Sequence, residues 1–212
     1  MPDASPWPEI HRERAALADD LAGVSDAAWS TPSLCRGWTV HEVLGHVVAT
    51  AKLTPVTFFG RLAGSGFRFG AMAAKNVARE TAGGPAATLA QLRAHANATT
   101  GPPGPADSWL GEIVVHGTDI RRPLGLERAF PTATLVEVAE FYRRSNLLIG
   151  AKKRIAGLTL RASDTDWSTG SGPEVRGPLL ALILAMTGRG AVLEELAGPG
   201  VDQLSARCGA QA

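Results

Sequence analysis

The chain has 212 residues, of which 45% are hydrophobic and 19% are charged, and its formal net charge is +1. This composition is typical of a globular protein with a sizeable core and excludes an intrinsically disordered chain. A net charge near zero, without a long run of Lys or Arg, argues against binding to nucleic acid or to an anionic membrane surface.

The sequence also carries little sign of export. The first residues, MPDASPWPEI, lack the apolar core of a secretory signal, and the apolar stretch GPLLALILAM is too short to span a membrane. The two cysteines, Cys35 and Cys208, lie far apart and have no metal-binding spacing. Together these features predict a soluble cytoplasmic protein with reduced thiols.

Two amphipathic helices are expected at the start of the chain. In the first, at about residues 8–24, apolar side chains such as Ile10 and Leu17 recur at helical spacing. The second follows a turn-rich link and begins at Thr39, because Thr39 and Glu42 have the spacing of a capping box and Val43 begins an apolar stripe.

The middle of the chain is less regular. Glycines and aromatic residues alternate over residues 53–80, so a helix is expected only at about 71–79, and a short helix follows in ATLAQLRAHANATT. A longer helix is expected at about 105–121, stopped by Pro123 and a turn at Gly125, and another begins near Thr132.

The pattern changes after Lys153. Apolar residues alternate in GLTLRAS, which indicates a strand, and LLALILAMTGR predicts a short buried helix. The predicted fold class is therefore mainly α. Residues 1–152 are expected to form a helical bundle, and residues 153–212 a small α+β unit.

One helical motif could bind a metal ion. Glu112 and His116 lie one turn apart on the helix at 105–121, and His46 borders the apolar stripe of the second helix. Two facing helices would thus offer three N/O ligands, the number found in open divalent-metal sites. The same spacing is also common in an ordinary hydrogen-bonded pair at a helix edge, so both interpretations stay open.

The remaining candidate ligands are weaker. His41 borders the other edge of the second helix, and His11 and His95 lie in polar helices where solvation is expected. Cys35 precedes His41 by six positions, which is not a known zinc-ligand spacing, so Cys35 is interpreted as structural or incidental.

The stretch LCRGWTVHEVLGHV, followed much later by EIVVHGTDIRRPLG, resembles the DinB-like superfamily, and within it the mycothiol-dependent maleylpyruvate isomerase group of actinobacteria. The resemblance implies a four-helix bundle whose divalent metal is held by His46, Glu112 and His116. It also implies a C-terminal sterol-carrier-like domain, for which residues 153–212 would be a reduced form.

The resemblance implies a metal-dependent enzyme that activates a low-molecular-weight thiol, mycothiol, as a metal-bound thiolate for S-transfer or isomerisation. Zinc is the favoured metal, with nickel and manganese as alternatives. Asp119 is expected to orient a ligand imidazole. The expected substrate contacts are Asn76, Arg79, Trp109 and Arg189.

The expected partners are a small-molecule thiol and an electrophile, while the electrophile and the oligomeric state stay open. The alternative function is a non-catalytic metal-binding or stress-response protein of the same fold, in which the bundle and its metal site persist without thiol transfer.

Overall fold

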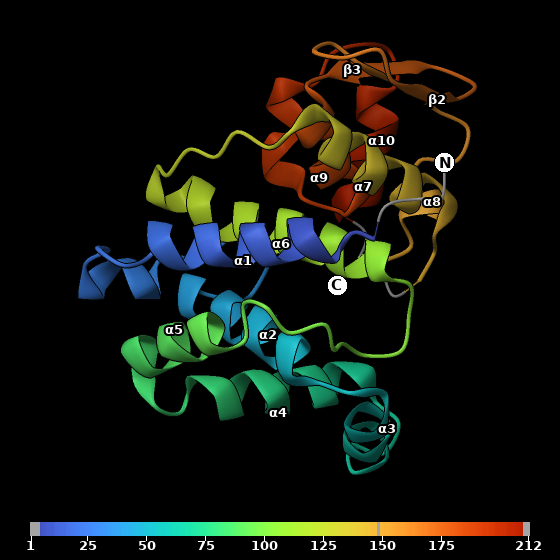
Figure 1. The fold of residues 1–212 in the computed structure, drawn as a ribbon. Helices are drawn as coiled ribbons and strands as arrows, with labels where there is room; N and C mark the ends of the chain where they lie inside the picture. The colour runs from blue at the N-terminus through green and yellow to red at the C-terminus, as the bar shows by residue number, and fades with distance from the viewer. Residues whose placement is uncertain (1–4, 148, 210–212) are drawn as a thin grey trace. The chain divides into compact units, whose positions relative to one another are not determined.

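The computed structural model describes residues 5–147 and 149–209 and divides into two compact units, Met1–Arg128 and Ala129–Ala212 (Figure 1). The first unit is helical, and the second combines helices with a small sheet. The predicted fold class, mainly α with a small α+β part, is confirmed. No helix in the described part of the chain is long and apolar enough to cross a membrane.

The first unit is a bundle in which α2 lies against α4, α5 and α6, while α1 lies against α5 and α6. Apolar side chains of α2 and α6 such as Val43, Leu44, Leu110 and Val114 are completely buried and form the core between these helices. Its elements are α1 (Trp7–Asp20), η1 (Asp26–Ser30), α2 (Val40–Lys52), α3 (Pro55–Ala63), α4 (Phe69–Thr81), α5 (Gly84–Ala94), α6 (Ala106–Arg121) and η2 (Arg122–Leu124).

The predicted capping box at the start of α2 is confirmed. The Thr39 side chain accepts a hydrogen bond from the backbone N–H of Glu42, and the Glu42 carboxylate accepts one from the backbone N–H of Thr39 at 2.8 Å. Two backbone donors that the helix itself cannot satisfy are thereby paired. The box fixes the first turn of the helix that carries His46.

Replacing Thr39 with alanine is expected to destabilise the protein by about 1 kcal/mol, the usual cost of losing such a cap. The melting temperature should fall by roughly 2–4 °C for a chain of this size. Thr54 is a matched control, because it forms the same kind of box with Thr57 at the start of α3, a helix without buried residues. Thermal unfolding should show little change for Thr54→Ala, and equal losses in both variants would contradict the prediction.

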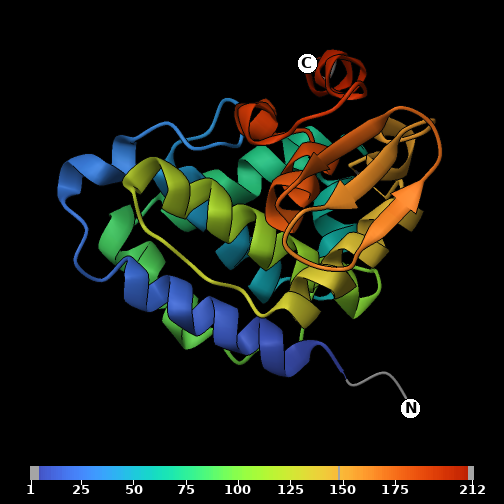
Figure 2. The same cartoon turned by 90° about the horizontal axis from the view of Figure 1, so that it is seen from above.

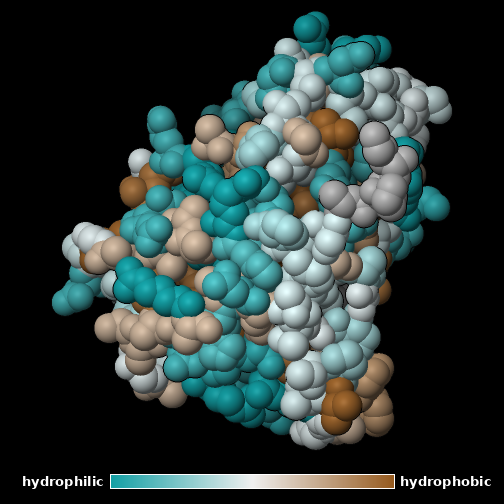
Figure 3. All heavy atoms as spheres, viewed as in Figure 1, coloured by the Kyte–Doolittle hydropathy of each residue, from teal (hydrophilic) through white to brown (hydrophobic). Residues whose placement is uncertain are grey.

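The prediction for residues 53–80 is wrong in one respect, because α3 was not expected. Pro55 occupies the first turn of α3 after the Thr54 box, which favours a helix start despite the following aromatics. Val56 and Phe59 of α3 are exposed, and Figure 3 shows hydrophobic atoms gathered at this corner. Because α3 buries no stripe of apolar side chains, the spacing of apolar residues in the sequence did not indicate this helix.

The end of α6 follows the prediction. The α-helix stops at Arg121, a 3-10 turn covers Arg122–Leu124, and Gly125 adopts a left-handed conformation with φ of +66°. Proline cannot continue the α-helix, and glycine takes positive φ without strain.

At Gly45, α2 and α4 approach each other closely. A Cβ atom at this position would lie 2.7 Å from the Thr81 Cγ2 atom of α4. The Thr81 hydroxyl donates a hydrogen bond to the Val77 carbonyl, which holds that side chain in place. A larger residue at position 45 would therefore require Thr81 or one of the two helices to shift.

The second unit contains a three-stranded sheet of order β2-β1-β3, in which β1 is antiparallel to β2 and parallel to β3 (Figure 2). The predicted strand at GLTLRAS and the predicted apolar helix are confirmed as β1 and α9, and α9 contacts β1 and β3. The elements are α7 (Thr132–Arg144), α8 (Ala151–Arg154), β1 (Thr159–Ala162), β2 (Ser168–Gly170), β3 (Glu174–Gly177), α9 (Leu179–Met186), η3 (Gly190–Glu195) and α10 (Val201–Gly209).

The helix α7 belongs to the second unit, since it packs against α8 and α9. The division into units therefore falls before α7, whereas the sequence places a domain boundary at 152/153. That boundary, and the reduced sterol-carrier-like character of 153–212, remain proposals about how the chain is built from domains.

Candidate metal centre

Helices α2 and α6 bring together His46, Glu112 and His116. The His46 Nε2 atom lies 3.7 Å from the Glu112 Oε1 atom, and the rings of His46 and His116 meet edge to face with centroids 4.9 Å apart. The two histidines are partly exposed and Glu112 is buried. The three side chains predicted from the sequence thus form one cluster at the interface of two helices.

The carboxylate of Glu112 is buried without ordinary compensation. Neither of its oxygens has a hydrogen-bond partner of normal geometry among the described residues, although the Thr50 hydroxyl lies nearby. Burial raises the pKa of Glu112, while His116, Thr50 and Arg14 act in the opposite direction. A buried carboxylate without hydrogen bonds is energetically costly. Its position beside two imidazoles therefore favours a bound cation as its partner.

His116 contacts Asp119, the residue that the sequence analysis expects to orient a ligand imidazole. The His116 Nδ1 atom lies 2.9 Å from the Asp119 Oδ2 atom, and the Asp119 side chain is fully buried. Because a carboxylate accepts, this bond favours, for the neutral ring, the tautomer with the proton on Nδ1 and the lone pair on Nε2. A ring held in this tautomer is prepared to act as a metal ligand through Nε2.

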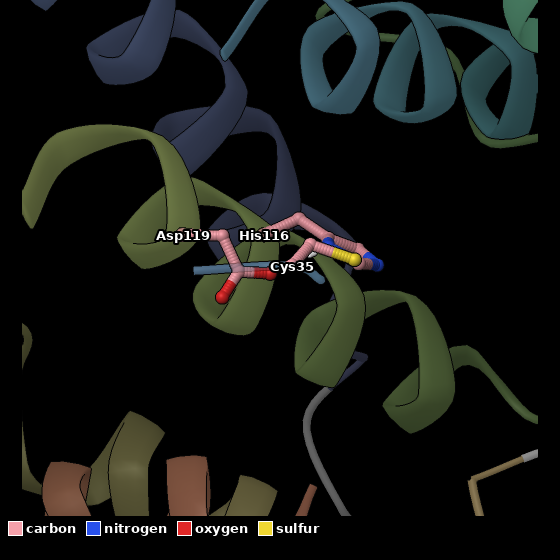
Figure 4. Close-up of side chains that lie close together, drawn as sticks. All are labelled: Cys35, His116 and Asp119. Atoms are coloured by element: carbon pink, nitrogen blue, oxygen red, sulfur yellow. Dashed lines mark hydrogen bonds and ion pairs between the residues drawn. The ribbon is translucent and has the colours of Figure 1, made fainter. Parts of the chain in front are cut away.

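Cys35, which the sequence analysis interprets as structural or incidental, also lies at this centre. Ligand atoms of Cys35, His116 and Asp119 all lie within 4.8 Å of one another (Figure 4). The sequence comparison of Cys35 with His41 and His46 missed this placement, because the thiol lies beside the histidine of α6. The sequence feature that could have indicated this position of Cys35 is the CRGW turn, residues 35–38, which lies immediately before the capped helix α2.

The other histidines lie outside this centre. The His41 Nε2 atom is 2.9 Å from the Thr88 hydroxyl of α5, and burial lowers the pKa of His41. His11 and His95 are partly exposed, and each also has a neighbour in the protein. His95 is held by the Gln91 carbonyl, 2.9 Å from Nδ1, and His11 stacks at a tilt against Trp7.

Two of the predicted substrate contacts line a small pocket between α3 and α4. The buried Asn76 accepts hydrogen bonds at its Oδ1 atom from Arg61 Nη1 at 2.9 Å and from Arg79 Nη1 at 3.1 Å. The pocket has a volume of about 210 Å³, and Lys75 adds a third cationic group to its wall. Its lining is therefore more suited to an anionic group than to hydroxyl groups alone.

The other two predicted contacts occupy different environments. The Trp109 indole of α6 packs against Gly101, where an added Cβ atom would come within 2.9 Å of the ring. Arg189 belongs to the second unit, is buried, and donates a hydrogen bond from Nη1 to the Thr187 carbonyl at 2.9 Å.

A divalent cation fits the cluster on α2 and α6. Two imidazoles and a carboxylate are a common ligand set for catalytic zinc, and a cation would supply the partner that the Glu112 oxygens lack. Asp119 supplies the carboxylate–histidine support that such ligands usually have.

Comparisons with known proteins identify the fold and the family of the chain. Two solved structures, one of a mycothiol-dependent maleylpyruvate isomerase and one of a mutant of that enzyme, match with a TM-score of 0.62 and 16% identity over 91% of each chain. They confirm the predicted DinB-like fold. A search of curated proteins gave no match. The family model of the mycothiol maleylpyruvate isomerase N-terminal domain matches residues 10–121. Since that match covers more than half of the chain, the protein belongs to this family.

Proposed function

We propose that the protein is a metal-dependent enzyme that uses mycothiol, acting in the cytoplasm on a small electrophilic substrate by isomerisation or S-transfer. The family description and the two solved structures name mycothiol and maleylpyruvate isomerase, and these names support the thiol and the reaction class. One observation carries the proposal, namely the buried Glu112 carboxylate beside His46 and His116.

In this proposal His46, Glu112 and His116 hold one divalent ion, with zinc favoured and nickel or manganese as alternatives. When bound, the ion lowers the pKa of an entering thiol, so that a thiolate nucleophile exists at neutral pH. Asp119 fixes the His116 ring through the 2.9 Å contact to Nδ1. The capped first turn of α2 and the Gly45 contact hold the turn that carries His46.

Substrate recognition is proposed for the polar groups already described. Arg79 and Asn76 would contact polar groups of mycothiol from the pocket between α3 and α4, and Arg61 belongs to the same hydrogen-bonded set. Trp109 would provide an apolar wall on α6. Arg189, which belongs to the second unit, remains a proposed substrate contact.

The metal assignment predicts one divalent ion per chain and its loss in a His116→Ala variant. That variant removes one of three ligands and should bind zinc at least about 10–100-fold more weakly, the range already seen for loss of outer-shell partners. Elemental analysis and competition with a chelator measure both quantities. His95→Ala is the matched control, since His95 lies on α5's C-terminal cap and should leave the metal content unchanged. Unchanged metal content in His116→Ala would refute the assignment.

The catalytic part is tested separately with the metal-loaded protein. Consumption of mycothiol in the presence of maleylpyruvate or a generic electrophile should require the metal. Metal binding without mycothiol binding at millimolar thiol, about −4 kcal/mol, would favour the non-catalytic metal-binding alternative.

A further inference from the structure

Cys35 is held in place by a rigid turn. The Trp38 N–H donates a hydrogen bond to the Cys35 carbonyl at 3.1 Å, and Gly37 has φ of +80°, as the third residue of a type II turn requires. The Ser33 hydroxyl donates to the Trp38 carbonyl at 2.8 Å and accepts from the Cys35 N–H. The backbone on both sides of the thiol is therefore fixed.

The same turn is attached to α6 beside the candidate metal centre. The Leu34 N–H donates a hydrogen bond to the Asp119 carbonyl at 3.2 Å. This contact joins the residue before Cys35 to the residue that orients His116. It explains why the Cys35 sulfur, a ring nitrogen of His116 and a carboxylate oxygen of Asp119 lie within 4.8 Å of one another.

The arrangement places a sulfur donor beside His116, one member of the cluster. His116 faces His46 at a centroid distance of 4.9 Å, and Cys35 lies beside the same imidazole from another segment of the chain. Nitrogen, oxygen and sulfur donors around one histidine are the set that zinc accepts in proteins, and a thiolate discriminates against manganese and magnesium. Figure 4 shows the thiol directed to the His116 ring, not away from it.

We propose that Cys35 is a fourth protein ligand of the metal, and that its sulfur occupies, in the resting protein, the position that a low-molecular-weight thiol takes during the reaction. The inference rests on the proposed metal site. It narrows the metal to ions with affinity for sulfur, such as zinc, and it gives the CRGW turn a role in metal binding.

Cobalt substitution tests the proposal, because a thiolate ligand adds a near-ultraviolet charge-transfer band to the spectrum of bound Co²⁺. The full-length protein loaded with cobalt should show this band. Cys35→Ser should lose the band and keep the visible absorption of cobalt held by the remaining ligands. Cys208→Ser is the matched control, since Cys208 is buried in the second unit and should leave the band intact. Absence of the band in the cobalt-loaded parent protein, or its persistence in Cys35→Ser, would overturn the proposal.

A second measurement needs no variant. Zinc should slow alkylation of Cys35 in the parent protein, as followed by mass spectrometry of the Cys35 peptide, and equal rates with and without zinc would also overturn the proposal. Addition of mycothiol to cobalt-loaded Cys35→Ser distinguishes a failure of the proposed Cys35 ligand from a failure of the proposed thiol-using function. A band that returns supports thiol binding at the metal. A band that is lost in the variant and does not return leaves Cys35 as a ligand and removes support for the proposed function.

Discussion

Replacing Glu112 with glutamine is expected to abolish tight metal binding and, at the same time, to stabilise the metal-free protein. The carboxylate is buried, both oxygens lack a hydrogen-bond partner of normal geometry among the described residues, and burial raises its pKa. Glutamine has nearly the same shape without the charge. The gain in free energy of unfolding at neutral pH should be on the order of 1 kcal/mol, because the substitution removes the buried charge but leaves an amide that also needs hydrogen-bond partners.

The pH dependence gives this prediction a definite sign. A raised pKa means that folded protein binds a proton at Glu112 more tightly than unfolded protein does. The contribution of Glu112 to the stability of the metal-free protein should therefore be most favourable below the ordinary carboxyl pKa and decrease as pH rises through the raised pKa. The advantage of Glu112→Gln should be small in acid and grow toward neutral pH.

Thermal unfolding of the metal-free and zinc-loaded proteins measures both effects. Zinc at 100 times its dissociation constant should stabilise the parent protein by about 2.7 kcal/mol and leave Glu112→Gln nearly unchanged. Glu80→Gln is the control, because Glu80 is also buried but is paired with Lys52 at 2.8 Å. This control should lose stability and keep the metal. A metal-free Glu112→Gln protein less stable than the parent would show that Glu112 has a structural role instead.

Replacing Arg128 with methionine is expected to destabilise the first unit by about 3 kcal/mol. The Glu13 side chain is fully buried in α1, and Arg128 binds both of its oxygens, at 2.6 Å and 3.1 Å. Loss of the guanidinium leaves a buried carboxylate with reduced compensation, which is the costly way to break an ion pair. The corresponding fall in melting temperature is roughly 6–12 °C.

A double variant distinguishes this cause from simple loss of packing. Glu13→Met combined with Arg128→Met removes both charges and should recover most of the stability. Arg161→Met tests an exposed ion pair, since Arg161 and Glu174 are both solvent-accessible, and should cost less than about 1 kcal/mol. Similar losses in the two single arginine variants would contradict the argument from burial.

The elements that could be predicted from the sequence are those whose local signals agree with their burial. The start of α2 is coded by Thr39 and Glu42, the end of α6 by Pro123 and Gly125, and β1 by strict alternation. By contrast, α3 buries none of its residues, and α10 and η3 follow glycine-rich segments without a clear stripe. Their existence depends on tertiary packing and on caps that periodicity does not record.

The site could be predicted in part for a related reason. Glu112, His116 and Asp119 lie on one helix, so their spacing places them on one side of it. His46 was a candidate because it borders the apolar stripe of the second helix, and the family resemblance implied the same three ligands. The position of Cys35 follows from a loop attached to α6 through the Leu34–Asp119 hydrogen bond. A contact between residues so far apart in the chain has no signature in local spacing.

The close contact at Gly45 has a consequence for the orientation of the neighbouring side chain, His46. Because Thr81 of α4 packs against Gly45, we expect rotation of this turn of α2 about the helix axis to be limited. The direction of the His46 side chain should therefore depend on the position of α4. Productive constellations tolerate errors of about 0.5 Å and 10–20°. We expect a methyl group at position 45 to displace Thr81 or α4 and thereby to change the orientation of the imidazole without contacting a donor atom. The size of residue 45 therefore affects the alignment of the ligands. A substitution at this position, which supplies no ligand, should change the affinity for the metal ion.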